Sequence, residues 1–112
     1  MSARGALTAA LLLLPLPAAA QPSFAGPSFD CRRAGDAVEF AICDSPALSA
    51  LDRDMAAAYL AVGGLPGVAS DQRAWLLARN RACAGRAGAG MEACLAPLYA
   101  ERIAALRAVA SK

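Results

Sequence analysis

Four cysteines in a chain of only 112 residues constrain this fold more than any other feature. They are Cys31, Cys43, Cys83 and Cys94. An even number of cysteines in a short exported chain predicts disulfides, because the periplasm and the cell exterior are oxidising. The chain lacks both histidine and a C-x-x-C pair, which argues against a zinc site and against a redox-active thiol pair. The cysteines are therefore expected to form two disulfides, for which three pairings are open.

Residues 1–20 are predicted to be a cleavable Sec-type signal peptide. Arg4 is followed by an apolar stretch from Leu7 to Leu16 and by Ala18-Ala19-Ala20, which are the basic start, apolar core and A-x-A ending of such peptides. Two prolines interrupt the apolar stretch before it reaches the roughly twenty residues that a membrane-spanning helix needs. No cysteine follows the stretch directly, so there is no lipobox. We expect a periplasmic or secreted protein with no membrane span after cleavage.

The charge of the mature chain argues against a nucleic-acid partner. Without residues 1–20, the chain has ten Lys and Arg residues against nine Asp and Glu residues, a net charge of +1, whereas nucleic acid selects a strongly basic face. Residues 21–62 have three basic and six acidic side chains, and residues 63–112 have seven basic and three acidic ones. We interpret this asymmetry as two halves that pack together with their charges partly facing one another.

Residues 31–112 predict an all-α fold, a small up-down bundle of three main helices plus one short N-terminal helix. Apolar residues recur at three- and four-residue steps, and no stretch alternates as a strand would. The helices are expected over about 36–43, 46–62, 70–84 and 91–109. Residues 21–30 are rich in Pro, Gly and Ser and are expected to form a flexible leader.

Several helix ends have clear capping signals. Asp36 is a suitable N-cap for the short helix, with Glu39 completing a capping box. Ser45 is expected to cap the next helix, with Pro46 at its first position. Ser70 or Asp71 is expected to cap the third helix.

This helix order narrows the disulfide pairing. Cys83 lies near the end of the third helix and Cys94 in the first turn of the fourth, across a glycine-rich turn that joins antiparallel neighbours. Cys31 precedes the short helix and Cys43 ends it. We therefore predict Cys31–Cys43 and Cys83–Cys94. Each closes a loop of about a dozen residues and contributes roughly 3 kcal/mol in the chain-entropy model.

The sequence offers no catalytic, metal or cofactor site. Histidine, the commonest acid–base residue, is missing. Asp52 and Asp54 are two residues apart on a helix and point about 200° apart, so they do not form a paired-carboxylate site. We predict that the chain is not an enzyme. Asp52 lies beside the apolar stripe and is interpreted as the partner of an arginine on another helix, with three candidates: Arg73, Arg79 and Arg102.

The aromatic residues are interpreted as parts of the core. Trp75 lies on an amphipathic helix of a bundle with little other bulk, which favours a core position over a ligand platform. Tyr59 and Tyr99 extend apolar stripes, and their hydroxyls are expected at the rim.

The order of these motifs resembles the lysozyme-inhibitor LprI N-terminal domain family. The first half contains Phe29-Asp30-Cys31, Glu39-x-x-Ile42-Cys43, Pro46-x-Leu48-x-x-Leu51-Asp52 and Tyr59. The second half contains Gln72-Arg73-x-Trp75, Arg79, Cys83, Cys94-Leu95 and Tyr99-x-x-Arg102-Ile103-x-x-Leu106. Their order, with all four cysteines in place, makes the resemblance specific from about Phe29 to Leu106.

The resemblance implies a partner and a role. The family consists of small helical, disulfide-bearing domains of exported bacterial proteins, and its name comes from a mycobacterial lipoprotein that inhibits lysozyme. Binding and inhibition of lysozyme or another cell-wall hydrolase is therefore the leading hypothesis. The alternative is a periplasmic binding or envelope-assembly module with an unknown protein partner.

The family motif describes the scaffold, and no inhibitory residue can be transferred from it. Its structural positions are Glu39, Asp52, Tyr59, Arg73, Trp75, Arg79, Tyr99 and Arg102. An inhibitor of a strongly basic lysozyme would benefit from an acidic face. The net charge of +1 supplies none globally, but a local one is expected from three carboxylates: Asp44, Asp52 and Asp54.

Overall fold

A computed structural model describes residue 5 and residues 25–112 of the chain, so the predicted signal peptide lies almost wholly outside the described residues. The elements are a 3-10 helix η2 (Cys31–Arg33) and four α-helices, α1 (Ala37–Asp44), α2 (Pro46–Val62), α3 (Val68–Cys83) and α4 (Gly88–Ala110). The described part of the chain contains no strand. The predicted all-α bundle of three main helices and one short helix is confirmed.

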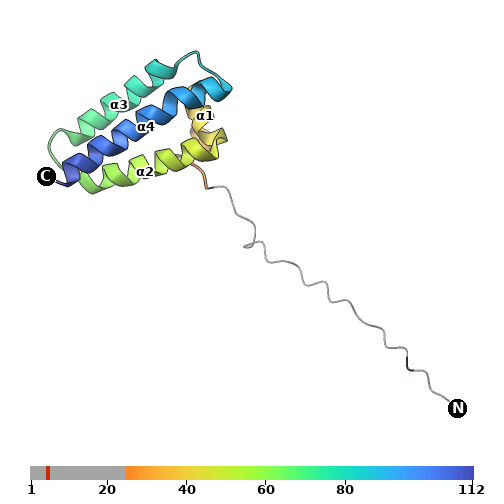
Figure 1. The fold of residues 1–112 in the computed structure, drawn as a ribbon, viewed down its shortest axis with the longest axis horizontal. Coiled ribbons are helices and arrows are strands. Elements are labelled where there is room, and N and C mark those ends of the chain that lie inside the picture. Colours follow the sequence, from red (N-terminus) through yellow and green to blue (C-terminus); the bar gives the residue numbers. More distant parts are fainter. Residues whose placement is uncertain (1–4, 6–24) are drawn as a thin grey trace.

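The three long helices lie side by side, with α4 between α2 and α3 (Figure 1). The short α1 lies across the end of the bundle where α2 and α4 begin. Helices α1, α2 and α4 turn an apolar stripe inward, and α3 buries Val68 and Cys83 together with the polar Gln72 and Arg79. The buried apolar side chains form a single cluster. Its buried members are Val38, Ile42, Leu48, Met55, Val62, Val68, Cys83, Met91, Leu95, Tyr99, Ile103 and Leu106.

Local signals set the beginnings of α1 and α2. The Asp36 carboxylate accepts a hydrogen bond from the Glu39 N–H at 2.8 Å, and the Ser45 hydroxyl accepts one from the Leu48 N–H at 3.1 Å. Both predicted N-caps are confirmed, as is proline at the first position of α2.

The beginnings of α3 and α4 differ from the prediction. Helix α3 begins at Val68, directly after Gly67, whose φ of 83° suits glycine. The predicted cap at Ser70 or Asp71 is wrong, because Ser70 lies inside the first turn and donates its hydroxyl to the Gly67 carbonyl at 3.0 Å. Helix α4 begins at Gly88, ahead of the expected Met91.

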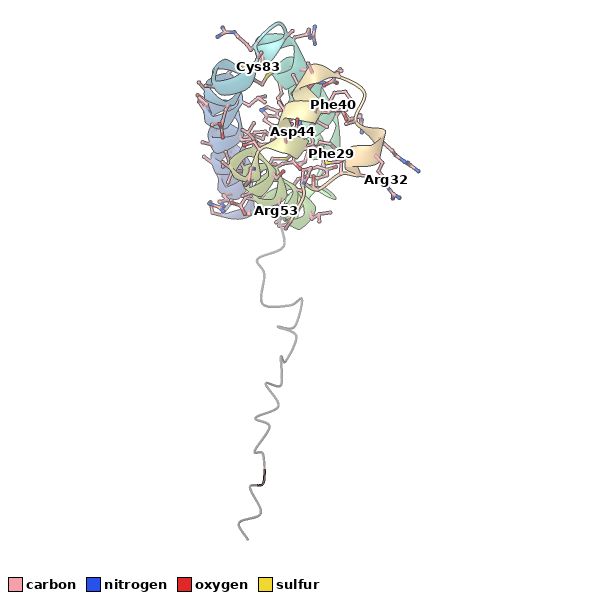
Figure 2. The ribbon with its side chains drawn as sticks, turned by 90° about the vertical axis from the view of Figure 1, so that its right-hand side faces the viewer. Phe29, Arg32, Phe40, Asp44, Arg53 and Cys83 are labelled. Carbon is pink, nitrogen blue, oxygen red and sulfur yellow. A yellow bond between two sulfur atoms is a disulfide. The ribbon has the colours of Figure 1, made fainter. Side chains whose placement is uncertain are left out.

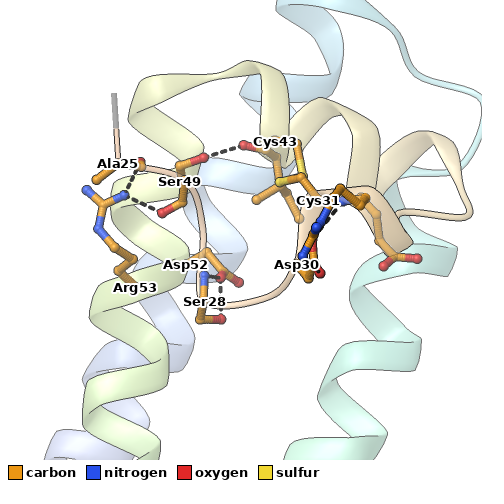
Figure 3. Close-up of a disulfide and its surroundings, with 12 residues drawn as sticks. Ala25, Ser28, Asp30, Cys31, Cys43, Ser49, Asp52 and Arg53 are labelled. Carbon is orange, nitrogen blue, oxygen red and sulfur yellow. Dashed lines mark hydrogen bonds and ion pairs between the residues drawn. A yellow bond between two sulfur atoms is a disulfide. The ribbon is translucent and has the colours of Figure 1, made fainter. Parts of the chain in front are cut away.

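Both predicted disulfides are confirmed. Cys31 and Cys43 are bonded with their Cα atoms 5.9 Å apart, and Cys83 and Cys94 with theirs 5.8 Å apart. The first bond ties the segment before α1 to the last turn of α1, as Figure 3 shows. The second joins the end of α3 to the beginning of α4. The end of the bundle that carries α1 therefore contains both covalent links.

Residues 25–30, the described part of the expected flexible leader, are held against α2. The Asp52 carboxylate accepts hydrogen bonds from the Ser28 N–H at 2.7 Å and from the Ser28 hydroxyl at 2.5 Å (Figure 3). The Arg53 guanidinium donates to the carbonyls of Ala25 and Gly26. A buried carboxylate on α2 thus supplies polar partners that the composition of this segment does not reveal.

Candidate functional site

A chain of polar contacts crosses the bundle from α2 to α3 through α4. It begins at Asp52, which is 1% exposed. The Tyr99 hydroxyl donates to Asp52 at 2.8 Å and accepts from the Arg79 guanidinium at 2.9 Å. Burial of Tyr99 raises the pKa of its hydroxyl above the usual value; the Arg79 cation opposes this rise and the Asp52 carboxylate adds to it. The hydroxyl therefore keeps its proton and bridges the carboxylate and the cation.

Arg79 is buried without a carboxylate in direct contact. Its guanidinium also donates twice to the side-chain oxygen of Asn80, at 3.0 and 2.9 Å, and the Asn80 amide donates to Asp36 at 3.4 Å. Its central carbon lies 5.8 Å from the Trp75 ring centre and 5.9 Å from that of Tyr99. Neutral side chains thus connect the cation to carboxylates on α2 and at the start of α1.

The predicted arginine partner of Asp52 is only partly correct. Arg79 is the relevant arginine, but it reaches Asp52 through Tyr99, and Arg102 donates instead to Gln72 at 2.8 Å. Arg73 is exposed. The predicted rim position of the Tyr99 hydroxyl is wrong, because that residue is fully buried.

The charge asymmetry between the two halves is not expressed as ion pairs. Within residues 25–112, the ion pair is Arg32–Asp30, at 2.9 Å, and both residues belong to the acidic half. The halves meet through hydrogen bonds, of which Tyr99 to Asp52 and Gln72 to Met55 are buried. Our expectation of facing charges is therefore wrong at the level of direct contacts.

Trp75, Tyr59 and Glu39 occupy partly buried positions around the network. The Trp75 ring packs edge-on against Tyr99, with the ring centres 5.2 Å apart, in agreement with the predicted core role. Burial, followed by the Asp36 carboxylate, raises the pKa of Glu39. Tyr59 packs against the core from α2, so its ring belongs to the scaffold.

One hollow lies beside this network and is called here the α2–α3 cleft. Its volume is about 330 Å³. Its lining residues are Ser28, Phe29, Glu39, Asp52, Met55, Ala56, Tyr59, Gln72, Leu76 and Arg79. The buried polar groups on this wall already bind one another, and Gln72 donates to the Met55 sulfur at 2.8 Å while accepting from Arg102. The cleft is therefore built mainly from groups that hold the bundle together.

A larger hollow, called here the α1–α4 groove, lies at the end of the bundle that carries both disulfides. Its volume is about 520 Å³. Its lining residues are Ala37, Phe40, Ala41, Asp44, Ser45, Leu48, Arg86, Ala87, Gly88, Met91 and Glu92. Sequence reasoning included Asp44 in a local acidic face but missed Phe40 and Glu92. The signal that indicates Phe40 is its place on α1 two residues before the buried Ile42, which turns it outward.

The other carboxylates of the expected acidic face do not join Asp44. Asp52 is buried, and Asp54 is exposed on α2 but is not part of the groove. Glu92 of α4 lines the groove together with Asp44. The acidic residues that line the groove are therefore Asp44 and Glu92, and Asp52 and Asp54 are not among them.

Metal-binding clusters and membrane-spanning helices are both absent from the described residues. In the described residues, no group of three metal-binding side chains lies close enough to hold an ion. Among the same residues, no helix has the length and apolarity to cross a bilayer.

These features define a small, disulfide-stabilised helical domain with a buried polar network and an open groove at one end. The chain belongs to the lysozyme inhibitor LprI family, whose model matches residues 31–106. Neither the comparison with curated proteins nor that with solved structures gives a match. The family and the disulfides both indicate an extracytoplasmic protein.

Proposed function

We propose that this protein binds and inhibits a lysozyme or a related cell-wall hydrolase. The family match over residues 31–106 carries the proposal, because that family is described by lysozyme inhibition. The internal geometry supports a binding role. The side chains most suited to proton transfer, Asp52 and Tyr99, are buried and bonded to each other.

The proposal includes export before the protein acts. Residues 1–20 serve as a signal peptide, and the mature chain begins near Gln21. Both disulfides link cysteines of the mature part, and such bonds form in the oxidising compartments where a cell-wall hydrolase works. N-terminal sequencing of the exported protein should find a start close to Gln21, and a retained Met1 would contradict this part of the proposal.

A lysozyme turbidity assay tests the inhibition directly. Oxidised protein of residues 21–112 is titrated into suspensions of bacterial cell wall with a C-type or a G-type lysozyme. We expect clearing to slow with increasing protein in the micromolar range for at least one enzyme. Protein that has been reduced and alkylated is the matched control, because it has the same composition without the disulfides. Unchanged clearing by both enzymes would exclude the proposed function.

A further inference from the structure

The α1–α4 groove combines an apolar floor with an exposed aromatic wall. Leu48 of α2 and Met91 of α4 form the floor, at 1% and 2% exposure. Phe40 of α1 forms a side wall of the groove and is 52% exposed. An aromatic ring beside an apolar hollow is the usual form of an anchor point in a protein interface.

We propose that the α1–α4 groove is the surface that docks on a basic cell-wall hydrolase. The groove receives an apolar side chain of the enzyme, and a neighbouring basic side chain of the enzyme pairs with the carboxylates at the rim. This assignment rests on the proposed function and adds the place of contact and the chemistry of the partner's segment.

The charges at the rim favour a basic partner. Asp44 ends α1 four residues after Phe40, so the two lie on one helix face. Figure 2 labels both residues on α1. Glu92 lies across the groove on α4 and accepts a hydrogen bond from the Ser45 hydroxyl at 3.0 Å. Within residues 25–112, neither carboxylate has a basic side chain within 4.0 Å. Arg86 is the third charged lining group, so the carboxylates outnumber the cation.

The overall charge of the mature chain does not attract a basic enzyme, so the attraction has to come from the rim carboxylates Asp44 and Glu92. A net charge of +1 gives no long-range attraction toward a strongly basic enzyme. Carboxylates at the mouth of an apolar groove supply complementary charge at the point of contact, where it selects and orients the partner.

The disulfides hold both walls of the groove. Cys43 directly precedes Asp44, and Cys94 follows Glu92 by two residues. The first bond fixes the end of α1 and the second fixes the beginning of α4. Rigid walls lower the conformational entropy lost on binding, so these links prepare the groove for a partner as well as stabilising the fold.

Other exposed apolar side chains do not make a comparable surface. Leu60, Leu65 and Leu77 are exposed but line neither of the two hollows described above. In the α2–α3 cleft, the buried polar groups are already bonded within the molecule. Of these surfaces of the described residues, the α1–α4 groove joins an exposed aromatic ring to carboxylates with no basic side chain within 4.0 Å.

Two variants and two matched controls test the assignment by surface-immobilised binding to the C-type and G-type lysozymes. Phe40→Ala removes the apolar anchor, and Asp44→Lys with Glu92→Lys reverses the rim charge. Leu60→Ala is the apolar control, about 18 Å along α2 from Leu48. Asp71→Lys with Glu101→Lys is the charge control, because it makes the same change in net charge on exposed residues outside the groove.

We expect Phe40→Ala to weaken binding at least about tenfold, as truncation of an interface anchor does. The rim reversal should weaken it by about ten- to a hundredfold at low salt, and by less at 0.5 M salt because ions screen the charges. Both controls should stay within about threefold of the parent. Far-UV circular dichroism and the melting temperature establish that each variant is folded, and Asp44→Asn with Glu92→Gln repeats the charge test with side chains of the same shape.

The outcomes separate this assignment from the proposed function. A parent protein that binds neither lysozyme overturns both. A parent that binds, with folded Phe40→Ala and rim variants that bind equally well, overturns the groove assignment alone. Weakened binding by the control variants to the same degree also overturns it, because the effect would then not depend on the groove.

Discussion

The α2–α3 cleft and the α1–α4 groove both include residues of α1 and α2, but their charged groups are arranged in opposite ways. At the cleft, Asp52 and Arg79 are buried and are joined through the buried Tyr99 hydroxyl behind them. In the groove, Asp44 and Glu92 are exposed and have no basic neighbour within 4.0 Å in the described chain. A polar group that is satisfied internally stabilises the fold, and one left open at an apolar rim is available to a partner.

The structural positions of the family motif are distributed unevenly between the α2–α3 cleft and the α1–α4 groove. Four of its structural positions line the α2–α3 cleft, namely Glu39, Asp52, Tyr59 and Arg79. The exposed side chains of the α1–α4 groove are not among the motif residues. The residues that identify the family therefore describe the scaffold, and the residues that we assign to binding lie on a surface that the motif leaves open.

The largest expected loss of stability follows from Asp52→Ala. The change leaves the Ser28 N–H and the Tyr99 hydroxyl without an acceptor and removes the anion that Arg79 reaches through Tyr99. We expect the free energy of unfolding to fall by about 3–5 kcal/mol, the usual cost of breaking a buried charged network. Urea unfolding measures it.

Asp54→Ala is the matched control for this change. Asp54 lies two residues further along α2 and is exposed, so its removal should change stability by less than about 0.5 kcal/mol. The folded fraction of Asp52→Ala should still bind lysozyme as the parent does. Equal losses in the two alanine variants would show that the buried network does not stabilise the bundle.

The disulfide Cys31–Cys43 is expected to contribute both to the stability of the fold and to binding at the α1–α4 groove. Replacing both cysteines with alanine should lower the free energy of unfolding by about 3 kcal/mol, since the bond closes a loop of 12 residues. The change also frees the end of α1, which carries Phe40 and Asp44. Affinity for the enzyme should therefore fall in protein that is still folded, as calorimetry on the folded variant can test. Unchanged affinity would mean that the groove does not depend on this link.

Tyr99→Phe removes the hydroxyl that bridges carboxylate and cation. We expect a loss of about 1–3 kcal/mol at neutral pH, because Asp52 and Arg79 each lose a buried partner. Urea unfolding at neutral pH measures this loss. A variant as stable as the parent would show that the bridge contributes little.

The same variant should change how stability depends on alkaline pH. Burial raises the pKa of Tyr99 above its usual value of 10.0, so above about pH 10 the unfolded chain releases this proton and the folded chain keeps it. The stabilisation that comes from the raised pKa of Tyr99 is fully present below pH 10. Above pH 10, the free energy of unfolding falls by up to about 1.4 kcal/mol per pH unit as the pH rises. Tyr99→Phe should show a shallower fall over this range, and equal slopes would contradict the shift.

Local sequence signals were enough to predict most of the scaffold. Helix α2 has the predicted bounds, and the disulfide pairing follows from which helix ends are neighbours. The apolar steps that fix these helices depend on residues close together in the chain. The predicted start of α3 is wrong because Gly67 begins the helix through its backbone conformation and no side chain caps it, so the sequence contains no capping residue at that position.

The contacts of the buried network could not be predicted in the same way. Ser28 and Asp52 are 24 residues apart, and Tyr99 and Asp52 are 47 apart. Helical periodicity places each residue on a face but does not give its depth or its partner on another helix. The α1–α4 groove could not be predicted from the sequence for the same reason, because Phe40 and Glu92 come together only when α1 is placed across the beginning of α4.

Ser45→Ala is the smallest and most discriminating change, because Ser45 contributes to both stability and the groove. Its hydroxyl caps α2 by accepting from the Leu48 N–H and also donates to Glu92. Loss of the cap should lower the free energy of unfolding by about 1 kcal/mol, which thermal unfolding can resolve. Loss of the exposed bond to Glu92 frees a rim carboxylate without removing its charge, so lysozyme affinity should change by less than about threefold. A larger loss of affinity than Asp44→Asn with Glu92→Gln produces would mean that the orientation of the carboxylate, and not its charge, governs docking.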